Sequence, residues 1–203
     1  MKLYFSQGAC SLSPNIVAHE AGLPISLEKV DLRTKKTGSG ADFVAINPKG
    51  YVPALELDDG QLLTEGPTIV QYLADKNPAA GLIPAAGTLE RYRVQEMLGY
   101  INSELHKAFS PLFSDKTTPE VREAQIATLK KRYALLDQRL AGKSYLFGDT
   151  FTVADAYLFT ITRWAALVKV DLSELANLGA FQERVAARPA VQAAMKAESP
   201  LAP

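Results

Sequence analysis

The chain changes character at residues 76–87, where prolines and glycines interrupt every regular pattern. Before this stretch, short apolar runs typical of strands alternate with helical runs, whereas every later pattern is helical. The expected elements of the first part are strand 2–6, helix 13–21, strand 26–30, a polar loop at 33–40, a helical turn at 42–46, strands 54–57 and 61–63, and helix 65–75. This order predicts an α/β N-terminal domain over residues 1–80, βαβαββα with a four-stranded mixed sheet, and an all-α C-terminal domain over residues 88–203.

Five helices are expected in the second part of the chain. They span residues 89–113, 120–140, 153–168, 175–187 and 189–197. The segment 153–168 is apolar on nearly all sides, which predicts that it forms the buried centre of the helical domain.

The charge balance and the cysteine count exclude several classes of function. Lys and Arg total 22, as do Asp and Glu, so the net charge is zero and no basic excess favours nucleic acid or an anionic membrane. One cysteine rules out an intrachain disulfide, and the fold therefore needs no oxidising compartment. The sequence shows no secretory leader and no apolar run of about 18 residues. We therefore expect a cytoplasmic protein.

The single cysteine, Cys10, follows the first expected strand and precedes the helix that begins near Ser13. The free N–H groups and the positive dipole end of a helix stabilise a thiolate, which predicts a lowered thiol pKa and a reactive role. The alternative is that Cys10 is a small buried hydrophobic residue.

Two further segments have the chemistry of a peptide-binding site. A cis Val52–Pro53 bond would leave the N–H and C=O of Val52 facing outward, where an extended peptide could pair with them; the alternative is a trans proline that opens an edge strand. Glu65 and the N–H of Gly66 lie at a helix N-terminus and would suit an α-amino-acid group, with Glu65 for the ammonium and the amides for the carboxylate. Alternatively, Glu65 only complements the helix dipole.

Together these features resemble the glutathione transferases. The resemblance spans the whole chain and rests on Cys10 after strand one, the VPAL segment 52–55, the TEG motif 64–66 and the appended helical half. Residues 148–155 resemble the family's C-terminal capping motif, in which Thr152 and Asp155 form a structural capping box. Residues 8–11, 47–50 and 103–106 resemble the bacterial beta class, whereas other classes have a tyrosine or serine in place of Cys10.

The resemblance implies a thioredoxin-like N-terminal domain, glutathione as co-substrate and no metal. It implies that the cysteinyl backbone of glutathione pairs with Val52 beside Pro53. The γ-glutamyl end would meet Glu65 and Gly66, and Lys35 would neutralise the glycyl carboxylate.

The resemblance also implies a homodimer in which the first helix of the C-terminal domain faces the thiol and the glutathione of the partner subunit. The residues concerned here are Gly99, Ser103, Glu104 and His106. Gly99, Ser103 and His106 are spaced i, i+4 and i+7, which predicts one stripe of that helix. The class usually has asparagine at position 99 and often serine at 66, so the two glycines predict weaker glutathione binding.

Three functions follow from these residues. In the first, a glutathione thiolate stabilised by Cys10, Ser11 and His106 attacks a small apolar electrophile, as in detoxification. The acceptor site would then lie against Phe109, Phe113 and Trp164, unless these are plain core residues. The second is a thiol–disulfide oxidoreductase in which Cys10 forms a mixed disulfide with glutathione. The third, a non-catalytic transferase-like binding module, is disfavoured by the presence of Cys10, Lys35 and Glu65.

Overall fold

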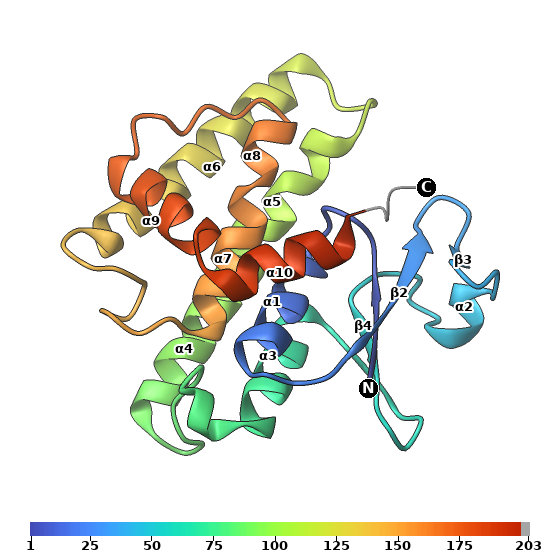
Figure 1. Cartoon of the computed structure of the whole chain (residues 1–203). Helices are drawn as coiled ribbons and strands as arrows, with labels where there is room; N and C mark the ends of the chain where they lie inside the picture. The colour runs from blue at the N-terminus through green and yellow to red at the C-terminus, as the bar shows by residue number, and fades with distance from the viewer. Residues whose placement is uncertain (200–203) are drawn as a thin grey trace. The chain divides into compact units, whose positions relative to one another are not determined.

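The computed structural model describes residues 1–199, which form two compact units (Figure 1). Of the described residues, the N-terminal unit comprises 1–83 and 188–199, and the helical unit comprises Pro84–Ala187. The last helix therefore belongs to the N-terminal unit, although the sequence pattern placed it in the domain 88–203. Residues 200–203 of that expected domain lie outside the described residues.

The N-terminal unit contains a mixed sheet of five strands in the order β3-β2-β1-β4-β5. The strands are β1 Lys2–Phe5, β2 Ser26–Asp31, β3 Lys36–Thr37, β4 Ala54–Glu56 and β5 Leu62–Thr64. β1 pairs parallel to β2, and every other pairing is antiparallel. The thioredoxin-like order of elements is confirmed, but the expected count of four strands is wrong.

The additional strand, β3, lies in the stretch that was expected to be a polar loop. Lys36 and Thr37 pair with Asp31 and Val30, and the Thr37 hydroxyl accepts a hydrogen bond from the Ala41 N–H at 3.0 Å. A strand of two residues is too short to show the period of two by which strands are detected in a sequence.

Helices cover both faces of this sheet. α1 (Leu12–Glu20) and α3 (Gly66–Lys76) pack together on one face, and α2 (Phe43–Ile46) lies on the other (Figure 1). Because side chains alternate along a strand, Tyr4 faces away from its neighbours Leu3 and Phe5. Tyr4 packs in a buried cluster with Val30, Phe43, Val52 and Ala54.

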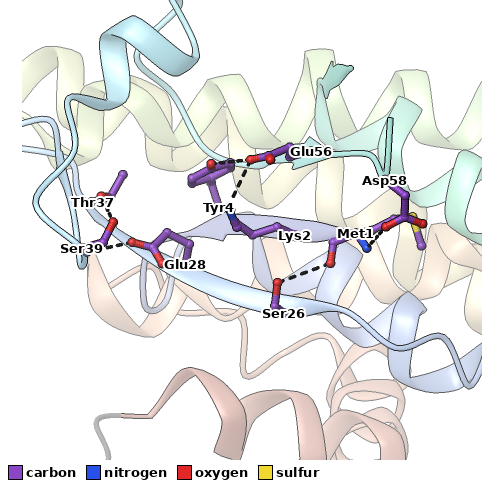
Figure 2. A network of polar contacts seen from close by, with 9 residues as sticks. All are labelled: Met1, Lys2, Tyr4, Ser26, Glu28, Thr37, Ser39, Glu56 and Asp58. Atoms are coloured by element: carbon purple, nitrogen blue, oxygen red, sulfur yellow. Dashed lines mark hydrogen bonds and ion pairs between the residues drawn. The ribbon is translucent and has the colours of Figure 1, made fainter. Parts of the chain in front are cut away.

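A polar network lies across the strands beside this cluster (Figure 2). The Tyr4 hydroxyl donates to Glu56 Oε2 at 2.6 Å, and Lys2 Nζ lies 3.4 Å from the same oxygen. Burial and the Glu56 carboxylate hold the pKa of the Tyr4 phenol above its usual value. The phenol of the first strand is therefore a protonated structural donor.

α10 (Pro189–Glu198) packs along α1 within the N-terminal unit. Arg188 forms a bidentate ion pair with Glu20, with N···O distances of 2.6 and 2.8 Å. At the other end, Asn15 Nδ2 donates to Ala194 O at 3.1 Å and to Glu198 Oε1 at 3.2 Å. α10 is thus fixed to the helix that follows Cys10.

The helical unit is built around α7 (Val153–Thr162), every residue of which is buried. This confirms the prediction from its apolar sequence. Its other elements are α4 Leu89–Tyr100, η2 Ile101–His106, α5 Lys107–Phe109, η3 Ser110–Phe113, α6 Pro119–Leu140, α8 Trp164–Leu167 and α9 Ala176–Ala186. None of the helices within residues 1–199 is long and apolar enough to span a bilayer.

The single helix expected over residues 89–113 is divided into four segments. Its centre, η2, is a π-helix in which the Lys107 N–H donates to the Asn102 carbonyl, five residues earlier. The apolar spacing of the sequence fits an α-helix nearly as well, so it did not reveal the wider turn. Helix 153–168 is likewise interrupted, at Arg163.

The capping box at the start of α7 is confirmed. The Thr152 N–H and hydroxyl each donate to Asp155 Oδ2 at 2.8 Å, and the Leu146 N–H donates to Oδ1 at 2.8 Å. Burial is the largest influence on this carboxyl and raises the pKa of Asp155 to about 6. Its three donors show that Asp155 has a structural role.

Candidate active site

Cys10 lies two residues before α1 and is 9% exposed. Its Sγ donates to the Val52 carbonyl at 3.4 Å. The expected fall in thiol pKa is wrong: burial raises the pKa of Cys10 to about 12. The backbone N–H groups of Cys10 and Ser11 lower this pKa, as expected for a helix N-terminus, but their effect is smaller than that of burial.

Ser11 is fully buried, and its hydroxyl is used within the turn before α1. Ser11 Oγ donates to the Ser6 carbonyl and accepts from the Ser6 N–H, at 3.2 Å in each case. A hydroxyl has one proton to donate, so a direct hydrogen bond to a thiolate requires the bond to Ser6 to break.

The Val52–Pro53 peptide bond is cis, as predicted. Val52 is buried, and its carbonyl accepts the Cys10 thiol. Val52 lies between α2 and β4, outside the helices and strands. Within residues 1–199 its N–H donates to no backbone carbonyl. This N–H is therefore suited to pair with an extended peptide.

The segment 49–53 is held by side chains from several directions. Lys35 Nζ donates to the Gly50 carbonyl at 2.9 Å and lies 5.7 Å from the centre of the Tyr51 ring. Asn47 is buried; its Nδ2 donates to the Tyr51 carbonyl at 2.8 Å and its Oδ1 accepts from the Lys49 N–H at 3.2 Å. Asn47 therefore fixes the loop from which Val52 is presented.

Glu65 precedes α3, and its carboxylate makes no capping bond to the helix. Instead, Glu65 Oε1 lies 2.7 Å from Lys49 Nζ, which also donates to Thr64 Oγ1 at 3.0 Å. Sequence reasoning missed this role of Lys49, because only the contact shows that it pairs with Glu65. Gly66, the first residue of α3, is buried at the helix N-terminus.

Lys35 and Glu65 also share an unusual backbone conformation. Three non-glycine residues within residues 1–199 have a positive φ, and these two are among them, at +58° and +71°. Such conformations are costly for side chains with a Cβ and gather at functional sites.

These residues fit a short extended peptide with a charged group at each end. Cys10, Lys35 and Glu65 are brought together because each contacts the segment 49–53. The segment offers the Val52 backbone, Glu65 and Gly66 offer a carboxylate and a helix N-terminus, and Lys35 offers a cation. All of these residues belong to the N-terminal unit.

The predicted residues of the helical unit differ in their surroundings. Gly99 and Ser103 are exposed, whereas His106 is half-buried and turned toward α7 and α8. The prediction assumed a uniform α-helical period, and the π-helix η2 departs from that period between Gly99 and His106.

Each of the remaining residues has a distinct environment. Glu104 Oε2 forms an ion pair with Arg132 at 2.6 Å, and the Glu104 carbonyl accepts from Arg132 Nη1 at 2.7 Å. Ser103 Oγ lies 3.5 Å from Glu104 Oε1. A Cβ on Gly99 would meet no heavy atom within 4 Å, so the asparagine usual in the class would fit at this position.

His106 belongs to an aromatic group. Its Nδ1 lies 2.6 Å from the Tyr157 hydroxyl, and its ring meets Trp164 edge-on at 4.9 Å. Trp164 also contacts Phe113, which is 51% exposed, and Phe109, which is fully buried. Phe109 is therefore a core residue, and Phe113 and Trp164 remain candidates for an acceptor site.

No group of three or more His, Cys, Asp or Glu side chains within residues 1–199 is arranged to hold a metal ion.

A thioredoxin-like unit followed by a helical unit is the architecture of the glutathione transferases. Residues 9–76 match the N-terminal domain of glutathione S-transferase, and residues 100–189 match its C-terminal domain. The glutathione S-transferase GstA of Escherichia coli O157:H7 is 46% identical over 198 residues, 98% of each chain. The chain belongs to the glutathione S-transferase family and is a transferase.

The solved structures narrow the class. A sphingomonad glutathione S-transferase complexed with glutathione is 48% identical, with a TM-score of 0.94 over 98% of each chain. The bacterial beta class enzyme of Sphingomonas chungbukensis is 47% identical, with a TM-score of 0.94 over 99% of this chain and 100% of the other. Within the family, the chain groups with the bacterial beta class.

Proposed function

We propose that this chain binds glutathione and conjugates it to small apolar electrophiles. The observation that carries the proposal is the set of contacts that Cys10, Lys35 and Glu65 make with the segment 49–53. In this proposal the glutathione backbone pairs with Val52, its γ-glutamyl end binds at Glu65 and Gly66, and its glycyl carboxylate binds Lys35.

The protonation state of Cys10 favours conjugation over exchange. A neutral thiol is a hydrogen-bond donor, and Cys10 already donates to Val52 in this structure. We infer that, when glutathione binds, the Cys10 S–H leaves the Val52 carbonyl and donates instead to the glutathione thiolate, which is the nucleophile. We also infer that His106 accepts the proton that the glutathione thiol loses. The partly exposed Phe113 and the neighbouring Trp164 support an apolar acceptor.

Thiol–disulfide exchange through Cys10 is the second candidate function. It is supported by the place of Cys10 beside Val52, where the cysteinyl part of glutathione is expected. The attacking species in exchange is a thiolate, which a pKa of about 12 makes scarce at neutral pH. Exchange is therefore proposed as a minor activity whose rate rises with pH.

A homodimer that acts in detoxification completes the proposal. Its support is the similarity to the beta class, in which Glu104 would reach the glutathione of the partner subunit. Light scattering at micromolar concentration should give twice the chain mass, and a monomeric mass would contradict the dimer. The cytoplasmic location stays a prediction.

The proposed function is tested by a panel of aryl halides, epoxides and chlorinated aromatics with glutathione, and hydroxyethyl disulfide as the redox substrate. Conjugation is expected to exceed disulfide exchange at neutral pH. Turnover of the disulfide alone would identify an oxidoreductase, and glutathione binding without any turnover would identify a binding module.

A further inference from the structure

Three polar side chains of the helical unit form a hydrogen-bonded chain that the proposed chemistry does not by itself require. His106 Nδ1 lies 2.6 Å from the Tyr157 hydroxyl, which in turn donates to Asn102 Oδ1 at 3.0 Å. Tyr157 is 1% exposed and comes from the central helix α7. Its hydroxyl is thus a polar group on a helix that is buried along its whole length.

The direction of these hydrogen bonds determines where the histidine proton lies. A tyrosine hydroxyl has one proton, and Tyr157 gives it to Asn102. With that proton on Asn102, the hydroxyl oxygen accepts from His106, and in this arrangement Nδ1 carries a hydrogen. In a neutral imidazole the other nitrogen, Nε2, is then the unprotonated one.

The backbone explains why Asn102 and His106 meet the same hydroxyl. Both belong to the π-helix η2, which ends with the bond from the Lys107 N–H to the Asn102 carbonyl. Trp164 lies against the His106 ring and restricts its orientation. Asn102 and His106 are four residues apart, so both side chains lie on one side of this segment and reach Tyr157.

We propose that Tyr157 and Asn102 are positioning residues that hold neutral His106 as its Nδ1–H tautomer, with Nε2 as the nitrogen that accepts a proton. This inference rests on the proposed function, in which His106 receives the proton of the glutathione thiol. In that step the S–H bond breaks, an Nε2–H bond forms, and the Nδ1–H bond to Tyr157 is kept. The products are a thiolate and an imidazolium, whose charge the Tyr157 oxygen stabilises.

The tautomer is measurable without any substrate. The chain has two histidines, so the His19→Gln variant leaves His106 as the only imidazole. In protein labelled with ¹⁵N-histidine, at about pH 8 where an ordinary histidine of pKa near 6.5 is neutral, NMR should show the hydrogen on Nδ1. A hydrogen on Nε2 would overturn the proposal.

Substitutions of Asn102 separate positioning from packing. In Asn102→Ala the Tyr157 hydroxyl loses its acceptor and is free to donate to His106, so the hydrogen should move to Nε2. Asn102→Asp keeps an oxygen acceptor and should keep the Nδ1–H tautomer. Tyr100→Phe removes another partly buried hydroxyl of the same unit, bonded to the Arg132 carbonyl, and should leave the tautomer unchanged.

The same variants connect the tautomer to catalysis. Asn102→Ala should lower kcat for conjugation by about tenfold or more, with little change in the KM for glutathione, because general bases contribute about 10²–10⁴-fold. Asn102→Asp should restore most of kcat. An altered tautomer with an unchanged kcat would overturn the positioning role. A wild-type protein without conjugating activity would contradict the proposed function, and the NMR experiment would still decide the tautomer.

Discussion

At the scale of single residues, two opposing effects act on the pKa of the Cys10 thiol. The amides before α1 favour the thiolate, and burial favours the neutral thiol. Position relative to the helix was readable from the sequence, but the extent of burial was not, because it depends on residues far away in the chain. The charges of Glu65 and of Glu198 on α10, both distant from Cys10 in the sequence, add to the rise in pKa.

Glu198→Gln is expected to lower the pKa of Cys10. The variant removes a negative charge and keeps an oxygen that can accept from Asn15. Alkylation by iodoacetamide at about pH 9 should become faster, and the only cysteine of the chain reports it without background. Glu183→Gln, at an exposed position of α9, serves as the matched control. Equal rates in all three proteins would show that Glu198 has no effect on the thiol.

Lys35→Ala is expected to raise the KM for glutathione about fivefold, since one partly exposed ion pair contributes about 1 kcal/mol. Lys35 would bind the same carboxylate in the ground state and in the transition state, so kcat should hardly change. Steady-state kinetics with Lys36→Ala as control checks this. A collapse of kcat at constant KM would assign Lys35 a different role.

At the scale of elements, most helices and strands were predicted to within a few residues, because their apolar periods are long enough to detect. The capping box of α7 was predicted because Thr152 and Asp155 have a fixed spacing. The two-residue strand β3 and the π-helix η2 were missed. The strand β3 is no longer than one period of a strand pattern, and η2 depends on a wider backbone turn that residue spacing does not distinguish.

Asp155→Asn is expected to destabilise the fold in a pH-dependent way. It weakens an acceptor of three buried hydrogen bonds, which should lower the free energy of unfolding by about 1–3 kcal/mol. Because burial raises the folded-state pKa of Asp155 to about 6, above the usual 3.8, the folded protein holds more protons here than the unfolded chain. The contribution of Asp155 to stability is therefore full below about pH 4 and falls as the pH rises to 6.

Urea unfolding of both proteins between pH 4 and 7 measures this difference. The wild-type advantage should be largest near pH 4 and should shrink toward pH 7. An advantage that grows with pH would mean that the pKa of Asp155 is lowered in the folded state.

At the scale of the whole molecule, the division into an α/β part and a helical part followed from the break at residues 76–87. The assignment of α10 to the N-terminal unit could not be predicted from the sequence. The pattern of an amphipathic helix shows which side is apolar but not which element that side packs against. The same limit applies to the site. Cys10, Val52 and Glu65 were identified from local motifs, whereas Lys49 and Tyr157 act through contacts with residues distant in the sequence.

The ion pair between Arg188 and Glu20 is expected to hold α10 on α1. Both side chains are largely buried, at 27% and 11% exposure. A double-mutant cycle with Arg188→Gln and Glu20→Gln should give a coupling of about 0.5–3 kcal/mol in the free energy of unfolding. The exposed pair Arg93–Glu96 is the comparison, and its coupling should be smaller. Equal couplings for the two pairs would contradict a special role for Arg188.

The return of α10 to the N-terminal unit has a consequence for synthesis on the ribosome. Translation is vectorial, and domains generally fold as units while the chain emerges. The helical unit is one continuous stretch and is complete once Ala187 has left the exit tunnel. The first stretch of the N-terminal unit emerges before the helical unit, but α10 follows only after it. The unit whose synthesis starts earlier is therefore the later of the two to be completed.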